Sequence, residues 1–282
     1  MKILITGARG FIGRVIVNKL LKSSNHNILI LIKKKINLKN KNVTIIKSDI
    51  DMNERKFEKI KNFQPKIVIH LAWEGIPNYS EKMSNINFIK QKNFFEKLFK
   101  INSIKKIIAT GSCSEIKNKF FLTSRYFVNS KKKIKNLLSK NCKLNNLSFV
   151  WFRLFYVYGK GQRKNGLIPF IINKIKKKEK IKLKKPNAKT DFINVEDVVN
   201  AINKKINFKK EFGVYELGNG FCVKNSDIVN YLKKINKKNY VKYKKFFNKY
   251  KNNSFYAKLN YHSKWQPKIS LEKGLLEMKY GK

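Results

Sequence analysis

Met1-Lys-Ile-Leu-Ile-Thr-Gly-Ala-Arg-Gly-Phe-Ile-Gly13 opens the chain, and this stretch decides the fold. Its apolar run predicts a buried strand over Lys2–Thr6, and the apolar spacing that follows predicts a helix over Phe11–Leu21. Glycines at every third position between them permit a tight turn and a close approach of backbone to a ligand. Because the start of a helix presents unpaired N–H groups and a partial positive charge, the turn is expected to hold paired phosphates. The residues expected at the phosphates are Gly7, Gly10, Phe11, Ile12 and Gly13.

Beyond this turn, apolar strands alternate with amphipathic stretches, as in βαβ units on a parallel sheet. These patterns predict an α/β fold, a doubly wound parallel sheet of the Rossmann type with a smaller C-terminal lobe. The expected domains are 1–158 for dinucleotide binding, with a returning segment near 191–220, and 159–282, which is mostly a substrate lobe. Further strands are expected at Asn27–Ile32, Val43–Lys47, Lys66–Leu71, Lys105–Thr110, Leu147–Leu154, Ile181–Leu183, Asp191–Val195 and Val214–Leu217, and further helices at Glu81–Ile101, Ser124–Lys140, Leu167–Lys176 and Glu196–Ile202.

The net charge of the chain is strongly positive, because 65 lysines and arginines stand against 17 aspartates and glutamates, which gives +48. A polyanion-binding protein is therefore one alternative, and it predicts binding that weakens steeply with salt. The lysines are, however, spread over the whole chain together with asparagine and isoleucine, a bias of the kind that an AT-rich genome produces. Arginine, which is preferred for phosphate and base contacts, is scarce beside lysine, so no specific nucleic-acid partner is expected.

The sequence carries no sign of a membrane segment or a metal site. No apolar run is long enough to span a bilayer, and the chain begins directly with a strand pattern, so a cytoplasmic protein without a membrane partner is expected. Cys113, Cys142 and Cys222 lack metal-type spacing and are interpreted as reduced thiols. The three histidines form no metal spacing either, and His70, at the end of a buried strand, is interpreted as structural.

Several motifs, taken in order, resemble the extended short-chain dehydrogenases/reductases, a superfamily that includes the NAD(P)-dependent nucleotide-sugar epimerases and dehydratases. Thr6-Gly-Ala-Arg-Gly-Phe-Ile-Gly13 resembles the TGxxGFIG turn of these proteins. The resemblance implies a nicotinamide dinucleotide cofactor, a nucleotide-sugar substrate and, as in many relatives, a homodimer. The later segments that keep the order and spacing of the family are Ser48–Asp51, Val68–Ala72, Arg153–Gly159, Asp191–Val199 and Trp265–Leu271.

The resemblance implies further cofactor contacts, with Asp49 and Ile50 at the adenine and Leu71 and Ala72 in a turn beside the cofactor. In dinucleotide-binding folds, a carboxylate at the end of the second strand holds the ribose of NAD and repels a 2′-phosphate. Here Lys33 and Lys34 stand at that place, and the ammonium group of either could pair with the 2′-phosphate of NADP. The expected cofactor is therefore NADP or NAD, with a mild preference for NADP, unless these lysines only reflect the lysine bias of the chain.

In the family, a serine or threonine after the fifth strand and a Tyr-x-x-x-Lys pair on the next helix carry the proton chemistry. Ser112 matches the serine, and Lys131 matches the lysine, which would also contact the cofactor. Four residues before Lys131, on the same helix face, stands Phe127, which has no exchangeable proton. Tyr126 is about 100° away around the helix, and an irregular helix start would bring it into place. The alternatives are another donor, such as Ser112, Cys113 or water, or a protein that binds cofactor without turnover.

These motifs predict an NAD(P)-dependent enzyme that transfers hydride at a carbon of a nucleotide-activated sugar, as an epimerase or a reductase. A dehydratase is less expected, because Ser114 stands where dehydratases of the family carry a glutamate, and Glu115 lies one residue further. Tyr156 stands where the family often carries a substrate-binding asparagine, and Arg163 suits a diphosphate, so these two and Ser112 are the expected substrate contacts. The alternative is a catalytically impaired dinucleotide sensor or scaffold, which the missing tyrosine supports.

Overall fold

The computed structural model describes residues 1–23, 26–33, 40–116, 125–237, 246–252, 254–259 and 265–281. The chain divides into two compact units. The first comprises Met1–Arg153 and Val199–Tyr215, and the second comprises Leu154–Val198 and Glu216–Lys282. The chain therefore leaves the first unit once, returns to it, and ends in the second. None of the described helices is both long and apolar enough to cross a membrane.

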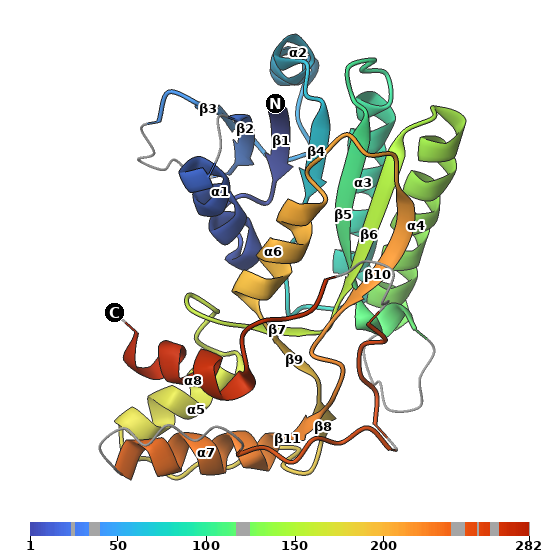
Figure 1. Cartoon of the computed structure of the whole chain (residues 1–282). Helices are drawn as coiled ribbons and strands as arrows, with labels where there is room; N and C mark the ends of the chain where they lie inside the picture. The colour runs from blue at the N-terminus through green and yellow to red at the C-terminus, as the bar shows by residue number, and fades with distance from the viewer. Residues whose placement is uncertain are drawn as a thin grey trace. The chain divides into compact units, whose positions relative to one another are not determined.

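The helices and strands follow one another as labelled in Figure 1. They are β1 (Lys2–Thr6), α1 (Phe11–Ser23), β2 (Asn27–Ile32), β3 (Val43–Lys47), α2 (Glu54–Phe63), β4 (Ile67–His70), α3 (Glu81–Leu98), β5 (Lys106–Ser112), the 3₁₀ turn η1 (Cys113–Glu115), α4 (Arg125–Leu144), β6 (Ser148–Leu154), β7 (Tyr156–Tyr158), α5 (Leu167–Lys176), β8 (Lys189–Thr190), β9 (Phe192–Asn194), α6 (Val195–Lys204), β10 (Phe212–Leu217), β11 (Val223–Lys224), α7 (Asn225–Lys237) and α8 (Leu271–Tyr280).

The predicted α/β class is confirmed by a seven-stranded sheet in the order β10-β6-β5-β4-β1-β2-β3. Its central pairs are parallel, and the register places Leu4 beside both Leu29 and Val68. These three side chains belong to one buried cluster, which also holds Phe94 and Phe95 of α3. The apolar strands of the sequence are therefore apolar because helices cover the sheet, as expected of parallel strands.

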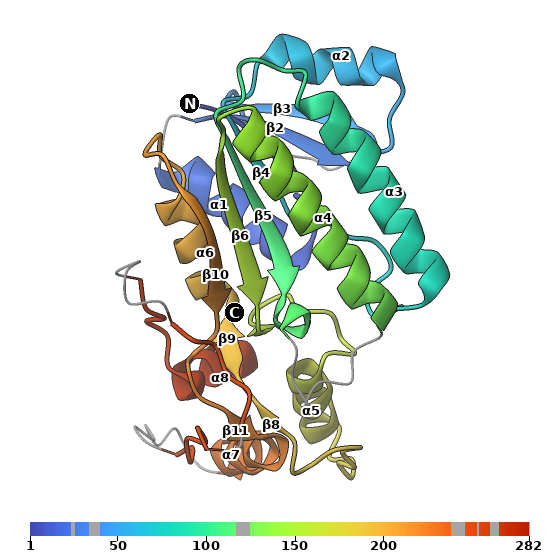
Figure 2. The same ribbon diagram turned by 90° about the vertical axis from the view of Figure 1, so that its right-hand side faces the viewer.

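Helices cover both faces of this sheet. Figure 2 shows α3 and α4 side by side against one face, with α1 on the other. On α4, Ile134 and Leu138 are buried and lie one helical turn apart, so they point to the same face and join the cluster with α3. Because both helices begin near the carboxyl ends of the strands, they direct their first turns toward the edge where ligands bind in such sheets.

The second unit has its own core and its own small sheets. Strand β7 pairs in parallel with β9, and β8 pairs antiparallel with β11. Helices α5, α7 and α8 contribute most of the buried side chains of a second apolar cluster, and β7, β9 and β11 contribute the others. Asp191, between β8 and β9, is fully buried and its carboxylate accepts backbone N–H groups from Asn219, Gly220 and Ala257. It therefore ties three segments of this unit together.

One predicted strand is wrong. Residues 181–183 are irregular, and the short strand β8 lies at Lys189–Thr190 instead. Ile181 and Leu183 are partly buried against the apolar cluster of the second unit. Their alternation, which looks like a strand in the sequence, therefore comes from packing of an extended segment against helices and not from pairing in a sheet.

Candidate active site

The predicted phosphate-binding turn lies between β1 and α1, at the carboxyl edge of the sheet. The N–H of Gly10 donates to the carbonyl of Gly7 at 2.9 Å, and the N–H of Arg14 donates to the carbonyl of Gly10 at 3.1 Å. Helix α1 thus begins at Phe11, and the N–H groups of its first turn have no partner within the helix. No acidic side chain stands in that turn, so the positive end of the helix is open to an anion.

Two glycines of the turn have no room for a side chain. Gly7 has φ +70°, and a Cβ there would lie 2.7 Å from the backbone N of Ala72. A Cβ on Gly13 would lie 2.0 Å from the carbonyl oxygen of Gly7. At Gly10, by contrast, the Gly7 carbonyl oxygen at 3.0 Å is the one atom of the described residues near an added Cβ, which leaves room that a phosphate could fill. The geometry of the turn therefore fits a dinucleotide.

The segment after β4 packs directly against this turn. The N–H of Leu71 donates to the carbonyl of Thr6 at 3.2 Å. His70 is buried, with its Nδ1 2.9 Å from the hydroxyl of Thr6 and its Nε2 2.9 Å from the side-chain oxygen of Gln91. Burial lowers the pKa of His70 to about 3, so the ring is neutral. It joins β1, β4 and α3 as a structural element, and it fixes Leu71 and Ala72 beside the glycines.

Lys33, Asp49 and Ile50 follow β2 and β3 at the same edge of the sheet. The N–H of Ile50 donates to Asp49 Oδ1 at 2.7 Å. Partial burial raises the pKa of Asp49, but hydrogen bonds from Lys90 and Lys33 outweigh it, so the pKa lies below its usual value. Asp49 is therefore ionised at neutral pH. Lys34, which the sequence also offers to a 2′-phosphate, lies outside the described residues.

Ser112 ends β5 and begins a capping box. Its backbone N–H donates to Glu115 Oε1 at 2.7 Å, and its hydroxyl lies 3.0 Å from the hydroxyl of Ser114. Glu115 is buried and accepts the indole N–H of Trp151 at 3.0 Å, and Arg153 lies 3.6 Å from it. Its carboxylate is thus committed to the interior. The Ser-x-x-Glu spacing was the sequence signal that could have shown this role.

Lys131 reaches the same strand end from α4. It is buried, and its ammonium group donates to the carbonyl of Thr110 at 2.9 Å. Burial lowers the pKa of Lys131 to about 8, and the nearby charge of Glu115 opposes this only in part. The ring of Trp73 lies across the ammonium group, with its centre 4.1 Å from Nζ. The structure therefore brings the Lys131 ammonium to the backbone of Thr110, two residues before Ser112 at the end of the same strand.

The structure places Phe127 and Tyr126 in different surroundings. Phe127 is buried, and its ring centre lies 5.2 Å from that of Trp73 and 4.8 Å from that of Tyr79. Tyr126 is half-buried, and its hydroxyl accepts a hydrogen bond of 3.0 Å from Arg125. Helix α4 is regular from Arg125 onward, while residues 117–124 lie outside the described part. Trp73 and Tyr79, which sequence reasoning missed, thus form an aromatic cluster with Phe127, and Trp73 joins this cluster to Lys131.

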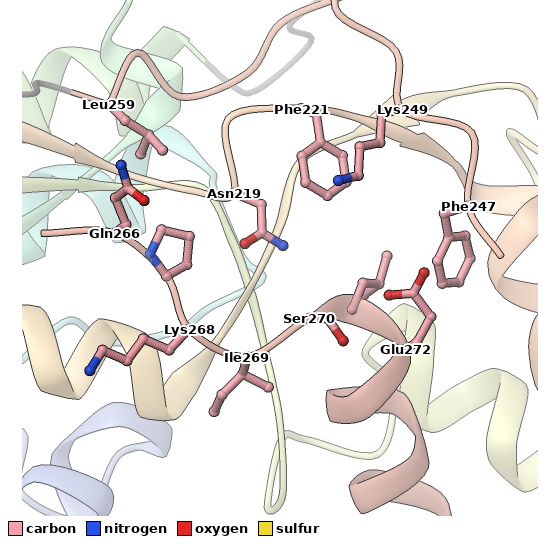
Figure 3. Close-up of a pocket in the computed structure, with 12 residues that line it drawn as sticks. Asn219, Phe221, Phe247, Lys249, Leu259, Gln266, Lys268, Ile269, Ser270 and Glu272 are labelled. Carbon is pink, nitrogen blue, oxygen red and sulfur yellow. The ribbon is translucent and has the colours of Figure 1, made fainter. Parts of the chain in front are cut away.

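The two predicted substrate contacts of the second unit, Tyr156 and Arg163, are both exposed. This unit contains a cavity of about 670 Å³. Figure 3 shows that Gln266 and Lys268 of its lining lie on the segment that leads into α8. Phe221 lies beside Lys249, and the Lys249 ammonium is 4.7 Å from the centre of the Phe221 ring. Neither Tyr156 nor Arg163 is among the described residues that line the cavity.

Comparisons with known proteins agree with this geometry. The model of the NAD dependent epimerase/dehydratase family matches residues 3–218 of the chain. CDP-abequose synthase of Salmonella muenchen is 27% identical, over 98% of the chain and 96% of its own length. dTDP-4-dehydro-6-deoxyglucose reductase of Escherichia coli is 24% identical, over 84% of the chain and 82% of its own length. A solved structure, dTDP-glucose 4,6-dehydratase of Bacillus anthracis in complex with NAD, has a TM-score of 0.78 at 22% identity and covers 99% of the chain and 95% of its own.

These findings bear on the alternatives that the sequence left open. The relatives are named as enzymes, so the sensor alternative finds no support among them. The family match covers the phosphate-binding turn, the end of β5 and helix α4, which are the parts that carry the predicted cofactor and catalytic residues. The chain belongs to the NAD dependent epimerase/dehydratase family, and its cofactor is NAD or NADP.

Proposed function

We propose that the chain is a reductase that converts a 4-keto nucleotide-linked deoxysugar into its 4-hydroxy form with NADH or NADPH. The Escherichia coli relative is named as a reductase of such a sugar, and the Salmonella relative, which matches nearly the whole chain, carries the name of a CDP-linked sugar synthase. The observation that carries reduction over dehydration is the position of Glu115. Its carboxylate is buried and accepts hydrogen bonds from the backbone of Ser112 and the indole of Trp151. The two residues between Ser112 and Glu115, Cys113 and Ser114, are not carboxylic acids, so they cannot supply the acid that elimination of water requires.

The residues of the first unit support this chemistry in the following way. When bound, the nicotinamide supplies the hydride to the ketone carbon. Ser112, at the end of β5, donates a hydrogen bond to the ketone oxygen, and Lys131 stabilises the negative charge that develops there. Because its pKa is about 8, the Lys131 ammonium can also deliver the proton through the Ser112 hydroxyl. Phe127 is buried and packs against the half-buried Trp73, and together they limit the access of water to this proton path.

A turnover assay with a panel of 4-keto CDP- and dTDP-sugars tests this proposal. The full chain is expected to oxidise one molecule of NADH or NADPH for each molecule of hydroxy sugar formed, because a reductase consumes its cofactor. An epimerase would interconvert two hydroxy sugars without net consumption of cofactor, and a dehydratase would release a keto sugar from a hydroxy substrate. Either result, or no conversion of any keto sugar by protein that binds cofactor, contradicts the proposal.

Replacing Phe127 by tyrosine is expected to raise the turnover number by about tenfold or more, because a phenol one helical turn from Lys131 adds a direct proton donor. The measurement is the turnover number on the accepted keto sugar, with thermal melting as a check on folding. Tyr126→Phe is the matched control, since the Tyr126 hydroxyl is bonded to Arg125, and it is expected to keep most of the activity. If Tyr126→Phe loses turnover and Phe127→Tyr gains none, the proton comes from Tyr126 and not through Ser112.

A further inference from the structure

Four charged side chains gather at the carboxyl edge of the sheet in the first unit, beside the phosphate-binding turn. Lys33 follows β2, Asp49 follows β3, Glu74 follows β4, and Lys90 lies on α3. The Lys33 ammonium lies 2.9 Å from Asp49 Oδ2 and also pairs with Glu74. The Lys90 ammonium donates to Asp49 at 2.9 Å and to Glu74 at 3.4 Å. Each lysine therefore bridges the same two carboxylates.

The charges of this cluster balance, in contrast to those of the chain as a whole. Only 17 acidic residues stand against 65 basic ones, yet two acids and two lysines meet here and sum to zero. The side chains of Asp49, Lys90 and Glu74 are 21%, 26% and 31% exposed, and that of Lys33 is 52% exposed, so water screens the pairs of Lys33 more than those of Lys90. The positive charge of the chain, which would attract a phosphate, is therefore balanced by carboxylates at this cluster.

That place matters because the end of the second strand is where a doubly wound sheet meets the ribose of the adenosine. The 2′-phosphate of NADP would bring roughly two negative charges to it. To bind that group, Lys33 would have to leave Asp49 and Glu74, and both carboxylates would then repel the phosphate with Lys90 as their remaining partner in the cluster. The hydroxyl of NAD requires no such separation of charge.

We propose that the cluster of Lys33, Asp49, Glu74 and Lys90 makes the chain select NAD over NADP, with Glu74 as the specificity-determining residue. The inference rests on the proposed function, because it presupposes that a dinucleotide binds at the turn. It reverses the preference that Lys33 suggests in the sequence. A lysine at the end of the second strand favours NADP when its charge is unpaired, and here two carboxylates neutralise it.

Isothermal titration of the full chain with NADH and NADPH at low ionic strength tests the proposal. The wild type is expected to bind NADH about tenfold more tightly than NADPH or better. Glu74→Gln releases Lys33 and Lys90 from one carboxylate and is expected to raise the relative affinity for NADPH by about tenfold. Glu96→Gln is the matched control, because Glu96 pairs with Lys92 on the exposed side of α3, and it should keep the wild-type ratio.

The ratio of the two affinities separates specificity from folding, since a purely structural role of Glu74 would change both affinities together. If Glu74→Gln fails to fold by thermal melting, Lys90→Met takes its place, and it is expected to lower the relative affinity for NADPH further. Equal binding of both cofactors by the wild type, tighter binding of NADPH, or an unchanged ratio in a folded variant overturns the inference. Binding of neither cofactor overturns the proposed function as well, and so the two failures are distinguishable.

Discussion

Replacing Lys131 by methionine is expected to lower the turnover number by about 10²–10⁴-fold, the range that a positioned proton-transfer group supplies. Methionine has nearly the length of lysine and fits a buried apolar site, so the fold should persist. What disappears is the charge that lies at the end of β5, where its ammonium donates to the carbonyl of Thr110. The measurement is the turnover number on the accepted keto sugar, and thermal melting checks that the variant folds.

The dependence of kcat/KM on pH is a second measurement that tests the role of Lys131. Burial lowers the pKa of Lys131 to about 8, so the charged form is present below that pH and is lost above it. Because the charged form is the active one, kcat/KM of the wild type should fall as the pH rises through about 8, and this limb should be absent in Lys131→Met. Lys132→Met is the matched control, since its side chain points about 100° away around the same helix. A Lys131 variant that keeps wild-type turnover would show that the proton chemistry lies elsewhere.

The parts of the structure that the sequence predicted well are those that local physics determines. The bounds of β1, β2 and β3 agree with the prediction. For β1 and β2 the reason is that a strand covered on both faces must be an apolar run and must stop where the apolar residues stop. The turn at Gly7 and Gly13 was predictable for a similar reason. The contacts that require these glycines join residues close together in the sequence, for example Gly13 and the carbonyl of Gly7, so the spacing of the glycines reveals them.

Elements with a polar surface were harder to predict. Helix α2 was missed because most of its residues are charged and only Phe57 and Ile60 are buried. The side chain of its N-cap residue, Asn53, accepts a hydrogen bond from the backbone N–H of Lys56. Asparagine is a preferred N-cap residue, so Asn53 was a sequence signal for the start of this helix. Helices α7 and α8 were not predicted either, although they are as long as α1 and α5, which were.

The candidate site shows a sharper limit. Ser112 and Lys131 could be placed from motif spacing, but the partners of Lys33 could not. Glu74 and Lys90 lie far from Lys33 in the sequence, and their meeting depends on how three strands and a helix are arranged. Ion pairs between flexible side chains leave no periodicity in the sequence. A lysine that the sequence shows as an available cation is therefore a neutralised one in the folded chain.

Replacing Gly13 by alanine is expected to weaken the binding of NADH by about 100-fold or more, although alanine is the better helix former. Helix propensity alone would favour the variant by about 1 kcal/mol, because Gly13 lies within the first turn of α1. Against this, the new Cβ would lie 2.0 Å from the Gly7 carbonyl oxygen and 2.8 Å from the Cα of Ala8. Both are backbone atoms, so no side-chain rotation removes the clash, and the start of α1 must move away from β1. Overpacking of this kind costs roughly 1–3 kcal/mol or more, and it outweighs the gain in propensity.

The expected loss of binding follows from the same movement. The first-turn N–H groups of α1 hold the phosphates only while they point at the turn, and each charge-assisted hydrogen bond contributes about 1.5–3 kcal/mol, so the loss of one or two gives the stated factor. Titration calorimetry with NADH measures it, and thermal melting should show a lower Tm for the variant. Gly166→Ala is the control, because its Cβ would first meet the end of the Gln162 side chain at 2.9 Å, which can move aside. Wild-type affinity in Gly13→Ala would mean that the dinucleotide does not use this helix start, and both the proposed reductase and its preference for NAD would lose their foundation.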